Sequence, residues 1–292
     1  MAPSDTLPAT ILTTEDLTAA LPLSVAAGWN QTALDWRVFL DHGRVFGCRD
    51  ERHGLIATAA CLPYDGSFGF VSMVLVDAAW RHRGHATSLM QACIGELERQ
   101  GMPPVLDATP EGAPVYEKLG FKPLFGLHRL EGEARAARVA EAVEAASGAV
   151  RPFRDADLEA ATALDAAAFG AARGFLLADF LRRDRVKAIV LADGSGFALA
   201  RPGFRATQIG PVVARRESDA IRLLETLLAS LEGRVFLDVP DRQAQIGAWA
   251  AARGFRRQRP FTRMAKVKVA TAAAASFGEP ARLMAAAGPE FG

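Results

Sequence analysis

A short basic segment carries the residue types that bind phosphate. It reads Arg81-His82-Arg83-Gly84-His85-Ala86 and lies between an apolar run at 70–76 and a helical pattern that begins at Thr87. A loop that enters the N-terminus of a helix presents unpaired backbone N–H groups and the positive end of the helix dipole. Glycine at position 84 lets a ligand approach the backbone where a Cβ would exclude it. A loop glycine alone is more typical of a simple turn, so the prediction of a phosphate site depends on the flanking strand and helix.

The residues on either side of this loop predict the elements that position it. The run 70–76 (FVSMVLV) is nearly continuous in apolar and β-branched residues, which is typical of a strand buried on both faces. After the loop, apolar residues recur with helical spacing until Gly101 ends the pattern. This helical face consists of Met90, Cys93, Ile94 and Leu97.

A second strand and helix follow directly. Val105-Leu106 predicts a short strand, and Thr109-Pro110 supplies an N-cap and a first-turn proline for a helix that ends at Gly120. Phe121 then begins the next strand. Two successive units of strand, loop and helix predict an α/β fold whose sheet contains at least one parallel pair.

The second half of the chain repeats this arrangement. A strand pattern at 209–213 and a helical pattern at 221–231 precede Val235-Phe236-Leu237-Asp238, which matches 104–107. Gly254-Phe255 then matches the earlier Gly-Phe pair. The 292 residues also suit two domains at roughly 100–200 residues each. We therefore expect two copies of one α/β fold.

The phosphate-type loop occurs together with a later helix that reads Tyr116-Glu117-Lys118-Leu119-Gly120-Phe121. This combination resembles the GNAT superfamily of acyl-CoA-dependent N-acyltransferases, whose pyrophosphate loop is R/Q-x-x-G-x-G/A and whose later helix often ends in Y-x-x-x-G-F. The resemblance covers 10–130 and is most specific at 73–121. It implies an α/β fold of two tandem GNAT-like domains, each with a central mixed sheet flanked by helices.

The resemblance also implies which residues hold acetyl-CoA. The strand before the loop would separate from its neighbour, and its backbone would pair with the pantetheine arm of the coenzyme. The loop amides would hold the pyrophosphate, and arginine side chains would add positive charge. The residues concerned are Met73, Val74, Leu75 and Val76 on the strand, and Arg81, His82, Arg83, Gly84, His85, Ala86 and Thr87 in the loop and first helical turn.

Tyr116 takes the position of the phenol that lies near the coenzyme sulfur in this superfamily. A phenol with an ordinary pKa of about 10 is protonated at neutral pH, so it suits a general acid for the departing thiolate. A backbone N–H near Val74 or Leu75 would stabilise the tetrahedral oxyanion. The base that accepts the amine proton stays open among Asp107, Glu111, Asp65 and a chain of water molecules. We predict Asp107 and Tyr116 as the catalytic residues, although a carboxylate at a strand end also stabilises turns.

Substrate contacts are expected from the segment that contains Trp29, Asn30 and Trp36. Two tryptophans within eight residues stand out in a chain with four. Their spacing of seven residues is equally typical of a helix packed on a core. If the rings line a pocket, a substrate ammonium group can lie against a ring face.

The second half departs from the family pattern at its own loop. Ser218 replaces the glycine, Glu217 and Asp219 add negative charge, and Ala250 stands where the first half has the phenol. These changes oppose phosphate binding. We therefore predict an acyl-CoA-binding acetyltransferase domain at 1–130, a linker at 131–150, a degenerate GNAT-like domain at 151–269 and a C-terminal tail at 270–292.

Composition limits the classes of partner. A net charge of +1 provides no whole-chain attraction for nucleic acid or an acidic membrane. There is no membrane-spanning apolar run and no signal-peptide pattern, and the three cysteines are too widely spaced for a metal or disulfide framework, so we expect a cytoplasmic protein without a metal. The predicted function is acetyl transfer from acetyl-CoA to a small-molecule or peptide amine, and a homo-oligomer is compatible with the sequence. The alternative is a non-catalytic acyl-CoA-binding sensor.

Overall fold

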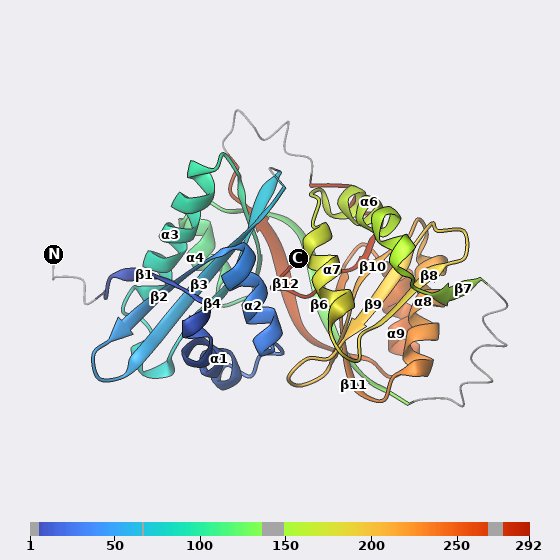
Figure 1. Ribbon diagram of the computed structural model, residues 1–292, viewed down its shortest axis with the longest axis horizontal. Coiled ribbons are helices and arrows are strands. Elements are labelled where there is room, and N and C mark those ends of the chain that lie inside the picture. The colour runs from blue at the N-terminus through green and yellow to red at the C-terminus, as the bar shows by residue number, and fades with distance from the viewer. Residues whose placement is uncertain (1–5, 66, 136–148, 268–276) are drawn as a thin grey trace.

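The computed structural model describes residues 6–65, 67–135, 149–267 and 277–292, and it consists of two α/β halves side by side (Figure 1). The elements of the first half are β1 (Ala9–Leu12), η1 (Thr14–Asp16), α1 (Leu17–Ala26), α2 (Ala33–His42), β2 (Arg44–Asp50), β3 (Gly54–Tyr64), β4 (Phe68–Val76), η2 (Ala78–Trp80), α3 (His85–Arg99), β5 (Pro104–Ala108), α4 (Ala113–Lys118) and β6 (Lys122–Ala134). The elements of the second half are β7 (Val150–Pro152), η3 (Asp155–Asp157), α6 (Leu158–Phe169), α7 (Gly174–Arg182), β8 (Lys187–Leu191), β9 (Phe197–Arg201), β10 (Thr207–Val213), α8 (Glu217–Ser230), β11 (Gly233–Pro240), α9 (Ala244–Ala252), β12 (Arg256–Ala265) and β13 (Leu283–Ala285).

Alternation along the strands of the first half divides its side chains between two helical layers. Leu62 and Phe70 pack with α1 and α2, whereas the adjacent residues Cys61 and Val71 pack with α3. Successive side chains of a strand point to opposite faces, so both faces of β3 and β4 are covered. This explains why the run at 70–76 is apolar at nearly every position, and it confirms the predicted buried strand.

All the strands except β13 follow one continuous sheet path, in the order β1-β2-β3-β4-β5-β12-β6-β11-β10-β9-β8-β7. The pairs β4·β5 and β10·β11 are parallel, as the strand-loop-helix units predict. The order is not sequential at the centre, because β12 from the end of the second half lies between β5 and β6 of the first. The strand β6 in turn pairs with β11 (Figure 1). Each half thus donates a strand to the sheet of the other.

This exchange decides how the chain divides. The expected boundary after residue 130 falls inside β6, which pairs with β11 up to Ala134. Most of the predicted linker, 136–148, lies outside the described residues. The helix predicted to begin at Thr109-Pro110 begins instead at Ala113, because Thr109 caps a turn by accepting a hydrogen bond from the Gly112 N–H.

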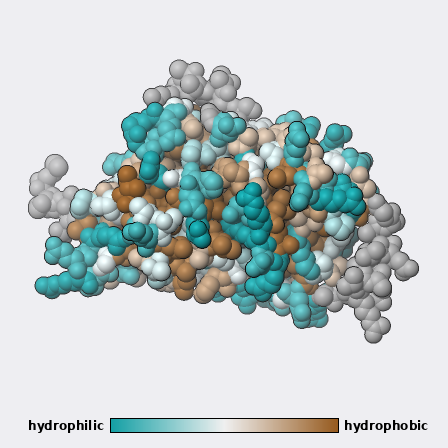
Figure 2. Space-filling model, in the orientation of Figure 1, coloured by the Kyte–Doolittle hydropathy of each residue, from teal (hydrophilic) through white to brown (hydrophobic). Residues whose placement is uncertain are grey.

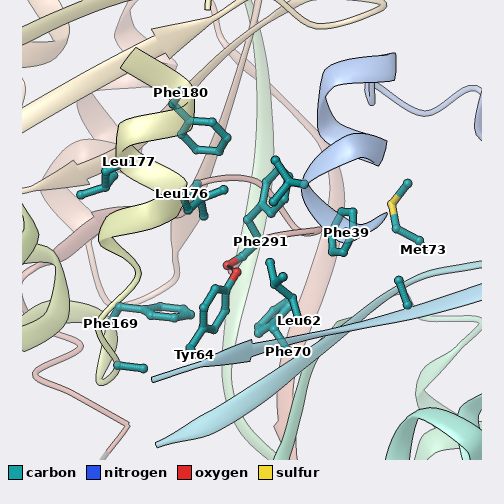
Figure 3. Packing of buried hydrophobic residues seen from close by; sticks show 14 of the residues in the cluster. Phe39, Leu62, Tyr64, Phe70, Met73, Phe169, Leu176, Leu177, Phe180 and Phe291 are labelled. Carbon is teal, nitrogen blue, oxygen red and sulfur yellow. Dashed lines mark hydrogen bonds between the residues drawn. The ribbon is translucent and has the colours of Figure 1, made fainter. Parts of the chain in front are cut away.

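A hydrophobic core joins the halves between α2 and α7 (Figure 3). Phe291 stacks on Phe39 with ring centroids 5.1 Å apart and meets Phe180 edge-on at 5.4 Å. Phe169 meets Tyr64 edge-on at 5.2 Å. Aromatic pairs in such geometry contribute beyond the area that they bury. Part of the predicted C-terminal tail, 277–292, is therefore largely buried structure between the halves.

Two buried arginines fix polar backbone and side-chain groups within this contact. Arg173 forms a bidentate pair with Asp165 and also donates to the carbonyl oxygens of Phe291 and Gly292. Arg129 on β6 forms a bidentate pair with Asp238 on β11. Breaking a buried pair by removing one partner leaves an uncompensated charge, at a cost of about 3–5 kcal/mol.

Because β6 and β12 belong to both halves, we expect the halves to unfold together. Urea unfolding followed by tryptophan fluorescence and by far-ultraviolet circular dichroism should give coincident curves with a single midpoint. Two separated transitions would show that the exchanged strands do not couple the halves.

Candidate active site

The gap between β4 and β5 provides the central feature of the site. These parallel strands pair only at Gly69 and Phe70, so the rest of β4 has a free edge on this side. A register shift between β3 and β4 places Met73 and Val74 opposite a single residue, and Met73 adopts φ of 53°. A bulge of this kind leaves backbone groups unpaired and turns them out of the ladder. An extended ligand can therefore pair with β4 as an added strand would.

The predicted phosphate loop leads directly into the N-terminus of α3. Gly84 is the N-cap with φ of 88°, a left-handed conformation that favours glycine. A Cβ at this position would lie 3.1 Å from the Thr6 hydroxyl, which donates a hydrogen bond to the Arg83 carbonyl oxygen. The first N–H groups of α3, from His85 to Thr87, have no partner within the helix. These N–H groups form the positive end of the dipole of this 15-residue helix, which faces the loop.

The side chains around this loop differ in their exposure. Arg81 and Arg83 are exposed, and Arg83 lies over the Trp80 ring at 4.8 Å. His82 is exposed with φ of 62°, whereas the His85 side chain is buried. Burial, followed by the charge of Arg83, lowers the pKa of His85, so its imidazole is neutral. The loop thus offers backbone donors together with two exposed cationic side chains.

Tyr116 lies on α4 across the gap from β4. Its ring packs against Phe121 at 6.1 Å, and its side chain lines a pocket together with Met73 and Val74. Burial raises the pKa of Tyr116 to about 12, with a smaller contribution from the Cys93 thiol. The phenol therefore carries its proton throughout the neutral range and is suited to donate it.

Asp107 also lines this pocket, at the end of β5. Both of its carboxylate oxygens accept hydrogen bonds from Arg263 on β12, each at 2.8 Å. Its side chain is fully buried in this pair. The strand that the second half donates therefore orients this predicted catalytic carboxylate.

The three predicted substrate residues have different positions. Trp29 lines the pocket beside Gln31. Asn30 bridges the halves by accepting hydrogen bonds from the N–H groups of Arg205 and Ala206. Trp36 is fully buried and donates to the Ser24 hydroxyl, so the structure places it in the core and away from the pocket wall. Trp36 lies on the side of α2 that faces the core, so for this residue the helical spacing indicates packing.

The remainder of the pocket wall comes from the second half, which sequence reasoning did not implicate. The pocket has a volume of about 90 Å³ and includes Arg259, Phe261, Pro289 and Glu290. A water molecule needs roughly 10–15 Å³ of such space, so several water-sized groups fit inside. No local motif marks these residues. The strand β12 lies at the site because of the strand exchange, and the segment 288–292 follows β13.

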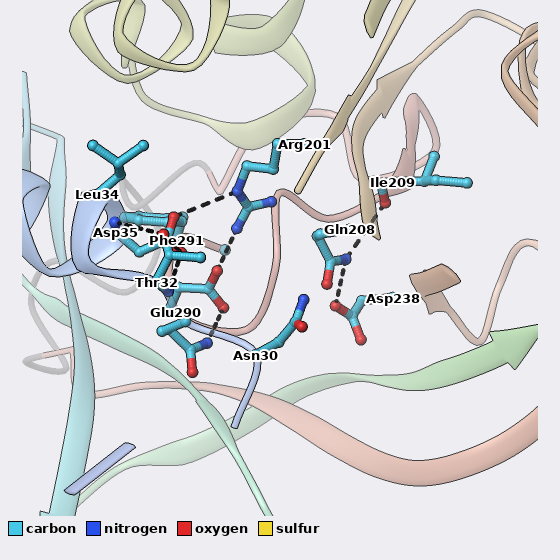
Figure 4. A network of polar contacts seen from close by, with 12 residues as sticks. Asn30, Thr32, Leu34, Asp35, Arg201, Gln208, Ile209, Asp238, Glu290 and Phe291 are labelled. Carbon is cyan, nitrogen blue, oxygen red and sulfur yellow. Dashed lines mark hydrogen bonds and ion pairs between the residues drawn. The ribbon is translucent and has the colours of Figure 1, made fainter. Parts of the chain in front are cut away.

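Glu290 belongs to a buried polar network between the halves (Figure 4). Its carboxylate pairs with Arg201 and accepts a hydrogen bond from Gln31 at 2.8 Å. Asp35 lies on the other side of Arg201, at 3.6 Å, and pairs with Arg183 at 2.7 Å. Burial raises the pKa of Glu290, and the nearby Asp35 charge adds to this effect although Arg201 opposes it.

The corresponding gap in the second half is filled by the chain itself. The strands β10 and β11 pair at 207–209, and beyond this point β13 pairs with β10 through Val212 and Val213. The Ala286 N–H donates to the Asp238 carbonyl oxygen, which joins the same segment to β11. A Cβ on Gly210 would lie 1.9 Å from the Ala286 carbonyl oxygen, so the approach is close. This edge has no room for a coenzyme arm.

The helix that follows this filled gap also lacks an anion site. The helix α8 begins at Glu217, and the Glu217 carboxylate accepts a hydrogen bond from the Ile246 N–H. Asp219 in the first turn pairs with Arg216. Carboxylates of the chain itself therefore occupy the positive end of the helix dipole.

Comparison with known proteins agrees with this division. Models of the acetyltransferase (GNAT) domain match residues 41–123 and, separately, 161–276. The chain is a tandem member of the GNAT superfamily. Its two halves correspond to the two matched domains, and its mixed sheet flanked by helices is the GNAT fold in duplicate.

Individual relatives extend over most of the chain. YitH, an uncharacterized N-acetyltransferase of Bacillus subtilis, is 24% identical over 237 residues, which cover 80% of this chain and 82% of that protein. The structure of a proposed acetyltransferase from Pyrococcus horikoshii has a TM-score of 0.78 and 16% identity, with 99% of this chain and 96% of that chain covered. A tandem GNAT protein from the clavulanic acid biosynthesis pathway has a TM-score of 0.62 and 15% identity, with 88% and 97% covered.

The outer surface supplies few further indications of function. Figure 2 shows hydrophobic surface in separate patches between hydrophilic side chains on the face that it presents. Among the described residues, no helix combines the length and apolar character that a membrane crossing requires.

Gly84→Asp should weaken acetyl-CoA binding at least about 10-fold, a change of 1.4 kcal/mol or more. The new side chain adds strain at a left-handed position and a negative charge at the helix N-terminus. Calorimetric titration measures the change, and Ser218→Asp at the corresponding loop of the second half is the matched control. Loss of binding in the control alone would place the coenzyme in the second half and contradict its assignment to the first.

Proposed function

We propose that this chain is an N-acetyltransferase that moves an acetyl group from acetyl-CoA to an amine, and that its first half holds the coenzyme. The observation that carries the proposal is the free edge of β4, which leads from the left-handed Gly84 loop to the pocket that contains Tyr116. The residues present fit acetyl-CoA, since helix N–H groups face the pyrophosphate position and a strand edge faces the pantetheine position. Bound there, acetyl-CoA supplies a thioester as the acyl donor.

Each functional group of the chain then has a task in a direct transfer. The loop amides and Arg81 and Arg83 bind the coenzyme phosphates. Backbone N–H groups released at the Met73 bulge stabilise the oxyanion that forms when the amine attacks the thioester carbonyl. Tyr116 donates its proton to the sulfur as the carbon–sulfur bond breaks.

The proton of the attacking amine needs an acceptor within the pocket. Both oxygens of Asp107 are held by the Arg263 guanidinium group, so we assign it the task of positioning this end of β5. Glu290 differs because only one of its oxygens accepts from an arginine, while the other accepts from the neutral Gln31 amide. Glu290 faces the same pocket, and burial raises the pKa of its carboxyl toward the working range of a general base. We therefore propose that Glu290 accepts the proton, with Gln31 and Arg201 holding its carboxylate in place.

Tyr116→Phe should lower kcat by about 10²-fold or more, the usual contribution of a positioned acid, while acetyl-CoA affinity stays within about twofold. Initial rates at saturating acetyl-CoA and calorimetric titration provide the two measurements. A protein that binds acetyl-CoA and transfers nothing to any amine, with or without the phenol, is instead the acyl-CoA-binding sensor of the alternative interpretation.

Glu290→Gln should remove the acidic limb of the pH profile of kcat. The carboxylate acts in its deprotonated form, so the wild-type rate falls as the pH drops through its raised pKa, whereas the amide cannot titrate. The alkaline side should stay flat to about pH 10, because the pKa of Tyr116 is about 12. Thermal unfolding of the variant controls for the loss of the pair with Arg201. An unchanged acidic limb would contradict this assignment.

A further inference from the structure

Arg259 lies at the interface between the halves, and its guanidinium group forms no ion pair with the residues that the structure describes. It lies half-buried on β12 and lines the pocket beside Trp29, Tyr116 and Glu290. Its Nε atom is buried and has no hydrogen-bond partner. Within the ranges that the structure describes, no carboxylate lies within ion-pair distance of its guanidinium group. The arginines buried around it do have carboxylate partners: Arg129 with Asp238, Arg173 with Asp165, Arg183 with Asp35, Arg201 with Glu290 and Arg263 with Asp107.

The surroundings of Arg259 make this arrangement unfavourable without a ligand. Arg129 stands directly opposite it on β6, and burial together with the Arg129 charge lowers the pKa of Arg259. The charges of Asp238, Glu111 and Glu290 act in the opposite direction and raise its pKa, but Asp238 and Glu290 form their ion pairs with Arg129 and Arg201. A half-buried charge without an ion-pair partner is unfavourable, so an anionic group from outside the chain would stabilise Arg259 at this position.

The position of Arg259 identifies which molecule brings that anion. The guanidinium group lies over the Phe261 ring at 4.9 Å, and the side chains of Arg259, Phe261 and Arg263 follow one another on the same face of β12. Arg263 is paired with Asp107 at the end of β5, and β12 lies across β5 from β4, so Arg259 lies beyond the end of β5 and away from the strand that leads to the Gly84 loop. The phosphates of a bound coenzyme belong to the loop at Gly84, and its thioester end carries no negative charge. The anion therefore belongs to the acceptor.

We propose that the acceptor is a small amine that also carries a carboxylate, such as an amino acid, and that Arg259 binds this carboxylate while the amine lies toward Glu290 and Trp29. This inference rests on the proposed function of the same pocket. A planar guanidinium group matches a carboxylate with two parallel hydrogen bonds. The Glu290 carboxylate and the Trp29 ring face then provide the complementary contacts for the ammonium group.

The test uses matched acceptor panels: the standard L-amino acids, and the same compounds as their carboxamides, which lack the negative charge. Coenzyme A release from acetyl-CoA measures kcat/KM. For the preferred side chain, we expect the acid to exceed its amide by about 10- to 100-fold, the range for a charge-assisted hydrogen-bonded pair. Arg259→Gln should remove that preference by slowing the acid alone, and Arg259→Lys should retain part of it.

Arg257→Gln is the matched control, because Arg257 lies on the same strand but is exposed and lies outside this pocket. It should leave the preference unchanged. Amides that react as well as the acids, or a preference that survives Arg259→Gln, would overturn the inference. So would acetyl-CoA that binds while neither panel reacts. Acetyl-CoA that fails to bind wild-type protein would instead overturn the proposed function itself.

Discussion

The position of β12 between β5 and β6 is the constraint on which the rest of the structure depends. It places Arg263 against Asp107, and it places Phe261 and Arg259 in the pocket wall. The strand β6 makes the reciprocal contact with β11 through the Arg129–Asp238 pair. The pocket is thus lined by residues from both halves, and neither half forms its wall alone.

The corresponding gap and helix of the second half have a different structure. Its own gap between parallel strands is filled by β13, and acidic side chains begin its α8 helix. The segment that fills this gap continues through Glu290, which faces the pocket of the first half, to Phe291, which packs in the shared core. One stretch of chain therefore closes the second cleft, joins the halves and supplies a carboxylate to the site.

The sequence predicts the parts of this arrangement that are encoded locally. The buried strand at 70–76, the glycine that begins α3 and the phenol on α4 follow from short patterns, and the structure has these elements in place. The strand exchange was not predicted, because a pairing such as that of Thr262 with Ala108 joins residues far apart in the chain. Glu290 and Arg259 were not predicted as pocket residues for this reason, since their places in the pocket wall depend on neighbours that only the assembled sheet supplies. Trp36 shows the converse, because an aromatic residue close to the site in sequence belongs to the core.

The measurement that tests the central claim most directly is the stoichiometry of acetyl-CoA binding to the intact chain by calorimetric titration. The two halves share a fold, but among the residues that the structure describes the gap between the parallel strands is open in the first half and filled by β13 in the second. We therefore predict one bound acetyl-CoA per chain. Two equivalents per chain would contradict the account, because a second coenzyme could bind only if the segment at 283–287 were absent from the gap beside β10.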